Sequence, residues 1–414
     1  MEPSYSPTRE DTSQRANENP ALNDTLITQV FNNTNIKTAW KQVRRNKGAA
    51  GSDGIAIEQF SEWIRPQWRS LKENALNGHY YPQPVKRVRI PKEDGSERLL
   101  GIPVVLDRVI QQAIVHVLSP MFDPTFSEHS HGFRPNRSAH DAVNRVREYC
   151  QQRRKIAVDI DLSKFFDRVN HDLLMTLLGR RIRDKGLLQL IGRYLRAGIL
   201  DGDTLIPSQE GVPQGGPLSP LLSNIMLDVL DKELEKRGHT FARYADDLIV
   251  MVKSQRAGER VLKSLTRLIE EDLKLKVNTE KSQVTKSTQC KFLGFSFRGN
   301  HIIWHPKSVE KFKHHVRELT CRSWGISMNT QLRQLSLYLR GWIQYYGIAN
   351  QYQQCVDLDR WIRRRIRMCY WKQWRRPRTK IHNLMKLGVP QRAAISCGLS
   401  SKSYWRSSKT AGIK

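Results

Sequence analysis

Three aspartates in the sequence have the surroundings of a divalent-metal site. Asp246 and Asp247 form a turn between two apolar segments, and Asp161 directly follows a third apolar run. Adjacent carboxylates repel one another unless a cation is near, and Mg²⁺ prefers oxygen ligands. The pattern predicts a site for two Mg²⁺ ions, with Mn²⁺ as a substitute, in which one ion activates an attacking 3′-hydroxyl and the other neutralises a leaving pyrophosphate. An isolated Asp-Asp pair is more often a solvated turn, so this interpretation needs support from the rest of the chain.

Short strands are the elements that would position these carboxylates. Residues 156–160 are an apolar run that predicts a buried strand ending at Asp161. Residues 241–244 and 248–252 predict a hairpin with Asp246 and Asp247 at its tip. The three carboxylates are therefore expected at the ends of strands, where a rigid backbone can hold them.

Apolar residues at helical spacing predict helices around these strands. Residues 27–43 and 107–118 have this spacing, and another helix is predicted to begin at Ser219 as its N-cap, with Pro220 in the first turn. The glycine-rich residues 46–54 predict a flexible loop. We also expect a hairpin over 86–90 and 98–102, a helix after residue 252, a strand over 292–297 and basic helices from Pro306 onward.

Charge and aromatic residues point to nucleic acid as a partner. The 414 residues include 69 Lys and Arg against 40 Asp and Glu, a net charge of +29 that is too large for an ordinary metabolic enzyme. Residues 301–414 hold 23 basic and 4 acidic residues and seven of the ten Trp, which suits phosphates and stacked bases. A membrane-surface helix fits less well, because the cations extend over several segments. The candidate nucleic-acid-binding residues are Arg363, Arg364, Arg365, Arg367, Lys372, Arg375 and Arg376.

Other sequence features bear on location. No run approaches the roughly 20 apolar residues that a membrane span needs, and the N-terminus lacks the apolar core of a signal peptide. We expect a cytoplasmic protein with no membrane partner. The six cysteines are scattered without a C-x-x-C pair, which favours reduced packing residues over a zinc ribbon or a disulfide framework.

Several motifs in fixed order carry a family resemblance. The motifs are Gly132-Phe133-Arg134-Pro135, Phe166-Asp167-Arg168-Val169-Asn170-His171, Pro213-Gln214-Gly215-Gly216-Pro217-Leu218-Ser219-Pro220, Tyr244-Ala245-Asp246-Asp247 and Phe292-Leu293-Gly294-Phe295. With these motifs the sequence resembles bacterial group II intron reverse transcriptase/maturases over about residues 26–410. It has no Cys/His-rich endonuclease module, which resembles the short class C members. It stops soon after residue 410, where family members usually continue, so part of the maturase surface is expected to be missing.

The resemblance implies an α+β right-hand polymerase with fingers and palm over residues 26–305 and an all-α basic thumb, or maturase domain, over 306–385. A mobile tail over 1–25 and a basic segment over 386–414 would flank them. The implied function is an RNA-directed DNA polymerase encoded by a group II intron, which copies RNA into DNA and acts as a maturase in splicing and mobility. Its implied partners are intron RNA, an RNA template with a DNA primer, target DNA and dNTPs, with nucleoid association when the protein is on DNA.

The resemblance also implies the metal ligands and their neighbours. Asp161 and Asp246 match the two principal metal ligands, and Asp247 matches a less directly coordinated carboxylate. Phe166, five residues after Asp161, matches the aromatic ring that blocks a ribonucleotide's 2′-hydroxyl. Asp159 lies seven residues before Phe166, which assigns it to structure rather than to the site.

Further positions match residues that hold the incoming nucleotide. Lys92 and Arg98 match a triphosphate-binding pair on the fingers, where cations face a polyanion. Gln214 and Gly215 match the loop behind the nascent base pair, where glycine permits a close backbone approach. Lys281 matches a lysine that protonates the pyrophosphate, although a surface charge explains a lone lysine nearly as well. Residues 292–297 match the strand that grips the primer.

Three other functions compete with this interpretation. The first is a maturase with little polymerase activity, which the set of acidic and basic site residues argues against. The second is a reverse transcriptase recruited to defence or DNA repair, which the long basic thumb argues against. The third is a viral RNA-copying RNA polymerase, which Phe166 disfavours because its ring would reject ribonucleotides.

Overall fold

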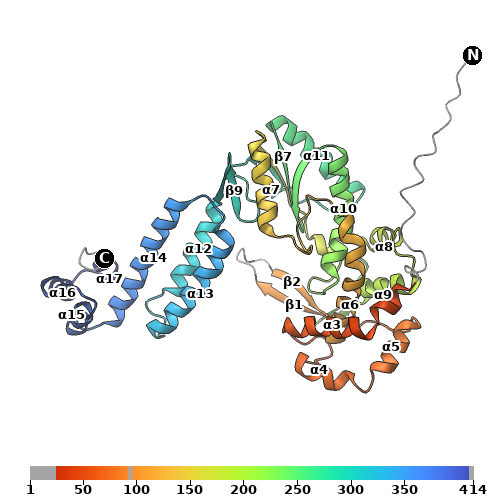
Figure 1. The fold of residues 1–414 in the computed structure, drawn as a ribbon, viewed down its shortest axis with the longest axis horizontal. Coiled ribbons are helices and arrows are strands. Elements are labelled where there is room, and N and C mark those ends of the chain that lie inside the picture. Colours follow the sequence, from red (N-terminus) through yellow and green to blue (C-terminus); the bar gives the residue numbers. More distant parts are fainter. Residues whose placement is uncertain (1–24, 92–94, 96, 410–414) are drawn as a thin grey trace, which may run out of the picture. The chain divides into compact units, whose positions relative to one another are not determined.

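The protein forms two compact units in a computed structural model (Figure 1). The predicted α+β class with a helical C-terminal part is confirmed. The predicted tail lies outside the described residues except for Thr25. The described residues are 25–91, 95 and 97–409; among them, the first unit takes those up to 142 and 158–284, and the second takes 143–157 and 285–409.

Two four-stranded sheets carry the predicted site residues. One has the strand order β6-β7-β3-β8 and the other β2-β1-β4-β5. Both predicted hairpins are confirmed: β6 pairs antiparallel with β7, and β1 with β2. The predicted strand over 156–160 is also confirmed as β3. The bounds are β1 Val85–Pro91, β2 Glu97–Ile102, β3 Ile156–Ile160, β4 Ile199–Asp201, β5 Thr204–Ile206, β6 Thr240–Tyr244, β7 Asp247–Val252 and β8 Gln283–Lys286.

Helices surround these sheets. One segment that was predicted as a single helix forms two helices. Residues 27–43 form two helices, because the side chain of Asn32 accepts a hydrogen bond from the Thr34 amide (2.9 Å) and starts a new helix there. The helix predicted over 107–118 is confirmed. The helical bounds are α2 Leu26–Val30, α3 Asn33–Arg45, α4 Ile57–Ile64, α5 Trp68–Leu76, α6 Val105–Phe122, η1 Asp123–Thr125, α7 Ala139–Gln151, η2 Phe165–Asp167, α8 His171–Gly179, α9 Lys185–Arg196, α10 Ser219–Lys236 and α11 Gln255–Glu271.

The start of α10 differs in detail from the prediction. Ser219 is the first helical residue rather than the N-cap, which is Leu218. The Ser219 hydroxyl donates instead to the carbonyl of Pro213 (2.6 Å), while Pro220 lies in the first turn as predicted. This hydrogen bond fixes the segment between Pro213 and α10.

From residue 295 onward, the second unit is a small hairpin followed by helices. The strand predicted over 292–297 is shorter than expected, because Leu293 and Gly294 take positive φ values of 50° and 87° and form a turn before β9. The helical pattern predicted from Pro306 is confirmed. The bounds are β9 Phe295–Arg298, β10 His301–Trp304, α12 Pro306–Leu319, α13 Met328–Tyr346, α14 Tyr352–Gln373, α15 Pro377–Lys386, α16 Gln391–Gly398 and α17 Tyr404–Ser407.

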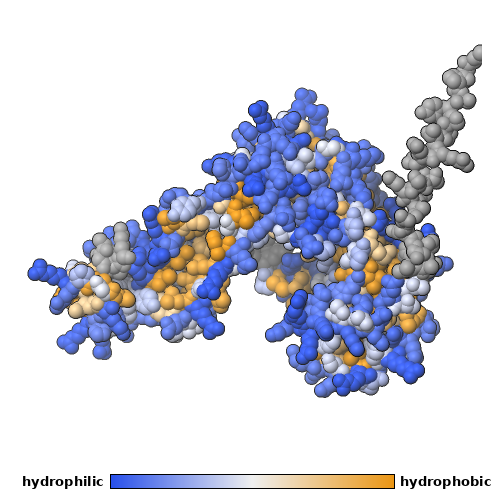
Figure 2. Space-filling model, viewed as in Figure 1, coloured by the Kyte–Doolittle hydropathy of each residue, from blue (hydrophilic) through white to orange (hydrophobic). Residues whose placement is uncertain are grey.

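The surface agrees with the basic composition. Hydrophilic residues cover most of the visible face, and hydrophobic residues show as smaller patches (Figure 2). Within the described part of the chain, no helix has the length and apolar character that a membrane crossing requires.

Candidate active site

The turn between β6 and β7 holds Asp246 in a strained but well-supported backbone. Tyr244 pairs with Asp247 across the hairpin, so Ala245 and Asp246 are the two turn residues. Ala245 has a φ of 58°, in a position where two-residue hairpin turns usually have glycine. Strain of this kind persists only where the surroundings fix the backbone.

A buried arginine provides part of that support. The Arg243 side chain is 1% exposed and donates to the carbonyl of Ala245 (2.9 Å) and to the hydroxyl of Ser130 (2.7 Å). Asp231 on α10, also fully buried, accepts from the Arg243 Nε (2.8 Å) and balances its charge. Arg243 therefore ties the turn that carries Asp246 to α10. Sequence reasoning assigned Arg243 only to a strand.

A glycine packs directly against the same turn. A Cβ atom on Gly132 would lie 2.2 Å from the amide nitrogen of Ala245, which is far closer than real Cβ contacts. The neighbouring His131 amide donates to the carbonyl of Arg243 (2.9 Å). The resemblance included Gly132 in a motif without giving it a role. Its role here is to let two backbones touch behind Asp246.

Asp161 begins the loop after β3, and a second segment holds its backbone. Its amide donates to the hydroxyl of Ser282 (3.0 Å), and its carbonyl accepts from the amide of Asn278 (2.8 Å). Lys281 lies on the turn between these two residues, with an exposed side chain. The structure therefore brings the backbone that carries Lys281 to Asp161. Its catalytic role stays a prediction.

The aspartates fit a metal site that substrate and water complete. Asp161 follows β3, Asp246 directly precedes β7, Asp247 is the first residue of β7, and β3 and β7 are neighbours in the sheet. Asp161 and Asp246 are half-buried, and within the described ranges no hydrogen bond or ion pair engages either carboxylate. Those ranges also contain no cluster of three or more His, Cys, Asp or Glu side chains that could hold a metal. Mg²⁺ is commonly bound by one or two carboxylates plus water and substrate phosphates, so two half-buried carboxylates without a protein cation suit it.

Four predicted nucleotide-binding residues line one cavity of about 480 Å³ in the first unit. They are Arg98 from β2, Phe166 from η2, and Gln214 and Gly215 from the loop before α10. Lys92 lies outside the described residues. The cavity also receives Phe133, which is 51% exposed although aromatic, and Arg108 from α6. The structure thus gathers residues that are more than 100 positions apart in the sequence.

The loop in this cavity is built on a close backbone contact. Gly215 has a φ of 131°, and a Cβ atom there would lie 2.5 Å from the carbonyl oxygen of Gly101 on β2. The Gly101 amide donates to the carbonyl of Gln214 (2.7 Å), and Arg98 Nε donates to the Gln214 side chain (3.3 Å). Only glycine fits this contact, which holds Gln214 beside Arg98.

The Phe166 side chain borders two cavities rather than packing in the core. It is half-buried and lines both the 480 Å³ cavity and an adjacent one of about 640 Å³. Its neighbour Phe165 is 3% exposed and packs edge-on against it, with ring centroids 5.2 Å apart. The Phe166 carbonyl accepts from the Val212 amide (2.6 Å). Phe165 therefore serves the core and leaves Phe166 facing the cavity.

The glycine loop after α3 contacts the same region. Arg108 donates to the carbonyl of Ala49 (2.5 Å), and Gly48 lies so close that a Cβ atom would meet Arg108 at 2.4 Å. Burial lowers the pKa of the Arg108 guanidinium. The preceding residue, Asp107, is buried and accepts hydrogen bonds from the hydroxyls of Tyr80 (2.7 Å) and Tyr194 (3.1 Å), and burial raises its pKa to about 6. The loop is packed against α6, which these contacts anchor.

Two family models match the chain. The reverse transcriptase (RNA-dependent DNA polymerase) model matches residues 90–297, about half of the chain, and the group II intron, maturase-specific domain matches residues 309–388. The chain belongs to the reverse transcriptase family. As an enzyme it is an RNA-directed DNA polymerase with a maturase-specific domain, and this family generally uses divalent metal ions.

This reverse transcriptase has curated relatives. Protein YkfC of Escherichia coli (strain K12) is 33% identical over 298 residues, covering 62% of this chain and 77% of YkfC. Group II intron-encoded protein LtrA of Lactococcus lactis subsp. cremoris is 29% identical over 326 residues, covering 63% of this chain and 54% of LtrA. The match thus spans about half of LtrA. A partial Cas6-RT-Cas1–Cas2 complex is 27% identical over 60% of this chain and 43% of that chain, with a TM-score of 0.39 that carries no argument.

The basic residues predicted in the second unit of the reverse transcriptase divide into two groups. Arg363, Lys372, Arg375 and Arg376 are exposed, although Arg363 also pairs with Asp359 (2.8 Å). The other three are half-buried and make internal contacts, so their contribution to RNA binding stays a prediction. Arg364 stacks 3.4 Å from the Trp405 ring centroid, Arg365 donates to the Thr320 hydroxyl (2.5 Å), and Arg367 donates to the Ser408 carbonyl (3.2 Å).

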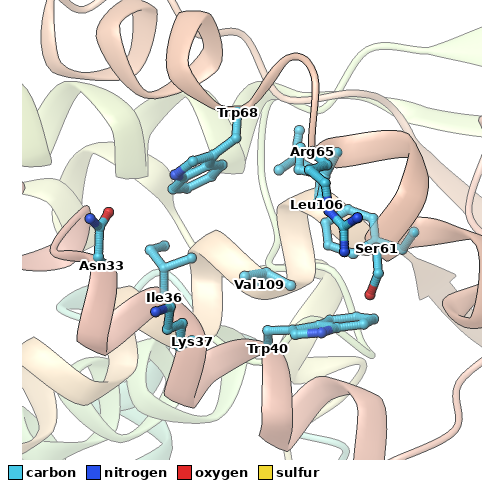
Figure 3. Close-up of a pocket in the computed structure, with 11 residues that line it drawn as sticks. Asn33, Ile36, Lys37, Trp40, Ser61, Arg65, Trp68, Leu106 and Val109 are labelled. Carbon is cyan, nitrogen blue, oxygen red and sulfur yellow. The ribbon is translucent and has the colours of Figure 1, made fainter.

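A separate apolar cavity of about 460 Å³ lies among the N-terminal helices of the reverse transcriptase (Figure 3). Trp40 from α3, Trp68 from α5 and Val109 from α6 line it, with Lys37 and Arg65 among the polar neighbours. None of the predicted site residues that the structure describes borders this cavity. It is therefore distinct from the cavity that holds Arg98 and Phe166.

Proposed function

We propose that this reverse transcriptase copies RNA into DNA at a site for two Mg²⁺ ions held by Asp161 and Asp246, with Asp247 close by. The observation that carries this proposal is the pair of half-buried carboxylates directly after β3 and directly before β7, two neighbouring strands, with no protein cation to neutralise them within the described residues. The bound ions would supply Lewis-acid activation of the primer 3′-hydroxyl and charge neutralisation of the pyrophosphate. The protein's own part is to hold both carboxylates in fixed positions.

The 480 Å³ cavity of the first unit, whose lining does not include the three aspartates, supports a dNTP-binding role. Arg98 presents a cation to the triphosphate, together with Lys92 by resemblance, and its hydrogen bond to Gln214 pre-orients both side chains. Phe166 borders the cavity where a ring would exclude a 2′-hydroxyl. Gly215 keeps the loop backbone close to β2 and leaves room for the nascent base pair. Lys281, on the turn bonded to Asp161, is the candidate proton donor to pyrophosphate.

The second unit supports an RNA-binding maturase role within the same function. The maturase-specific match over residues 309–388 favours a maturase that binds group II intron RNA over a reverse transcriptase with a role in defence or repair. We include a DNA primer, target DNA and dNTPs among the partners because DNA synthesis in intron mobility requires them. The exposed Lys372, Arg375 and Arg376 are the candidates for phosphate contacts.

The test separates polymerisation from RNA binding. Asp246→Ala removes a carboxylate without touching the basic second unit, so DNA synthesis on an RNA template should fall below detection while RNA affinity changes less than about twofold. Primer extension and filter binding on the same preparation measure the two effects. Normal extension by Asp246→Ala would contradict the metal assignment. A parallel loss of RNA binding would show that the variant acts through folding, and Asp246→Asn would then replace it.

A further inference from the structure

The second unit contains a cavity of about 490 Å³ with basic and aromatic walls. Arg317 lies near the end of α12, and Cys321 and Arg322 follow it in the next turn. Trp361 and Arg365 come from α14, and Trp405 comes from α17. The predicted RNA-binding set included only Arg365 from this group.

The charges around the cavity are unbalanced. Its lining holds three arginines, and no Asp or Glu is among the described residues that form it. Burial lowers the pKa of the Arg365 guanidinium, and the charges of Arg317 and Arg322 lower it further. Like charges held together in a partly desolvated space are costly, so the cavity suits an anion.

Three carboxylates of α12 and α14 are engaged outside the cavity, in contacts that include none of its three arginines. Arg365 donates to Thr320, which leaves Arg317 and Arg322 for an external anion. The pairs are Asp357 with Arg360 (3.6 Å), Asp359 with Arg363 (2.8 Å), and Glu318 with His314 (3.4 Å) and His315 (2.9 Å).

The walls of the cavity add flat aromatic surface. The guanidinium carbons of Arg317 and Arg365 lie 5.8 and 5.6 Å from the Trp361 ring centroid. The Trp405 ring is held in place by Arg364, which stacks on it and donates to its backbone carbonyl (2.9 Å). Fixed indole rings beside cations are suited to stacking an unpaired base whose phosphate is neutralised.

We propose that this cavity binds one unpaired nucleotide of RNA, with its phosphate between Arg317 and Arg322 and its base against the wall formed by Trp361 and Trp405. The inference rests on the proposed RNA-binding function and extends it to a defined site. A base-paired segment does not suit this site, because its bases are stacked within the helix and cannot reach the indoles.

Cys321 provides a local probe of occupancy. Its thiol is exposed and lines the cavity, whereas Cys355 on α14 is half-buried, is absent from the lining and serves as an internal reference. N-ethylmaleimide modification of the full-length protein is followed for each cysteine by peptide mass spectrometry. Single-stranded RNA at about ten times its Kd should slow modification of Cys321 about tenfold, because only free protein reacts. An RNA duplex, and an abasic RNA with the same number of phosphates, should protect less at equal concentration.

Paired variants test the arginines. Arg317→Gln with Arg322→Gln should raise the Kd for single-stranded RNA by at least about tenfold, so protection of Cys321 is lost at the original concentration. Arg333→Gln with Arg340→Gln removes the same charge from exposed positions on α13, outside the cavity, and should retain protection. Both pairs change exposed side chains, and thermal unfolding checks that each variant folds.

The outcomes distinguish this inference from the proposed function. The proposal that RNA occupies this cavity would be overturned if wild-type protein bound RNA without protecting Cys321. Equal loss of protection in the two paired variants would also overturn it. Equal protection by abasic and natural RNA would overturn the base contact. The proposed function is judged by wild-type DNA synthesis on an RNA template, which none of these results measures.

Discussion

The first unit gathers four of its predicted nucleotide-binding residues around one cavity, whereas in the second unit part of the predicted RNA-binding set makes internal contacts that stabilise the unit. Arg98, Phe166 and Gln214 all reach the 480 Å³ cavity, although they come from distant parts of the sequence. In the second unit, Arg364 and Arg365 are engaged by neighbouring helices and turns. A motif with fixed spacing specifies backbone positions, while a charge total does not specify which cations face solvent.

Among variants that leave the three aspartates intact, the largest expected effect comes from disturbing the backbone next to Asp246. Gly132→Ala would place a Cβ atom 2.2 Å from the Ala245 amide nitrogen, so the turn must shift. We expect DNA synthesis to fall roughly 100-fold, since a displacement of about 1 Å at a reacting group has effects of this size. Gly179→Ala is the matched control, because nothing lies within 4 Å of a Cβ atom there. Primer extension by Gly132→Ala at the control's rate would show that the motif does not position Asp246.

A smaller effect is expected on sugar selectivity. Phe166→Val should raise ribonucleotide incorporation by at least about tenfold, equivalent to about 1.4 kcal/mol, with a smaller loss of deoxynucleotide use. Single-nucleotide incorporation with both sugars on the folded variant measures the ratio. If Phe166 instead supported the core, both activities would fall together and the ratio would stay constant. Phe165→Val is the useful comparison, because Phe165 is the buried ring of the pair.

The smallest effects should separate the two groups of cations in the second unit. Arg365→Gln removes a half-buried donor to Thr320 and should cost about 1–3 kcal/mol of unfolding free energy, whereas Arg363→Gln loses an exposed pair worth about 0–1 kcal/mol. Arg375→Gln with Arg376→Gln should leave stability unchanged and flatten the slope of log affinity against log salt by about 1.4. Denaturant unfolding and salt-dependent RNA binding measure these effects. The comparison fails if Arg365→Gln and Arg363→Gln destabilise the protein equally.

Local patterns in the sequence predicted most elements, because strands and hairpins follow from the spacing of apolar residues and from the residue types in turns. The run over 156–160 is a strand, and the two hairpins have the expected partners. The errors occurred where one side chain or one φ value decides a boundary, as at Asn32, which starts a new helix, and at Gly294, which bends the chain before β9.

The supporting residues of the site could not be predicted in the same way. Arg243 is buried only because Asp231 and Ser130, from other elements, complete its contacts. Gly132 is required only because the turn at Ala245 touches it. Arg317 and Arg322 form a cavity only because α14 and α17 close it. Each role depends on a tertiary neighbour that no local spacing encodes.

Primer extension on an RNA template with controlled metal is the most direct test of the central claim. Wild-type protein with dNTPs should extend a DNA primer when Mg²⁺ is present, lose extension in EDTA, and recover it when Mg²⁺ or Mn²⁺ is restored. Asp161→Ala and Asp246→Ala should stay inactive at every metal concentration, because each lacks one of the two half-buried carboxylates. Extension by wild-type protein in EDTA, or by either variant at the wild-type rate, would contradict a metal-dependent polymerase site at these aspartates.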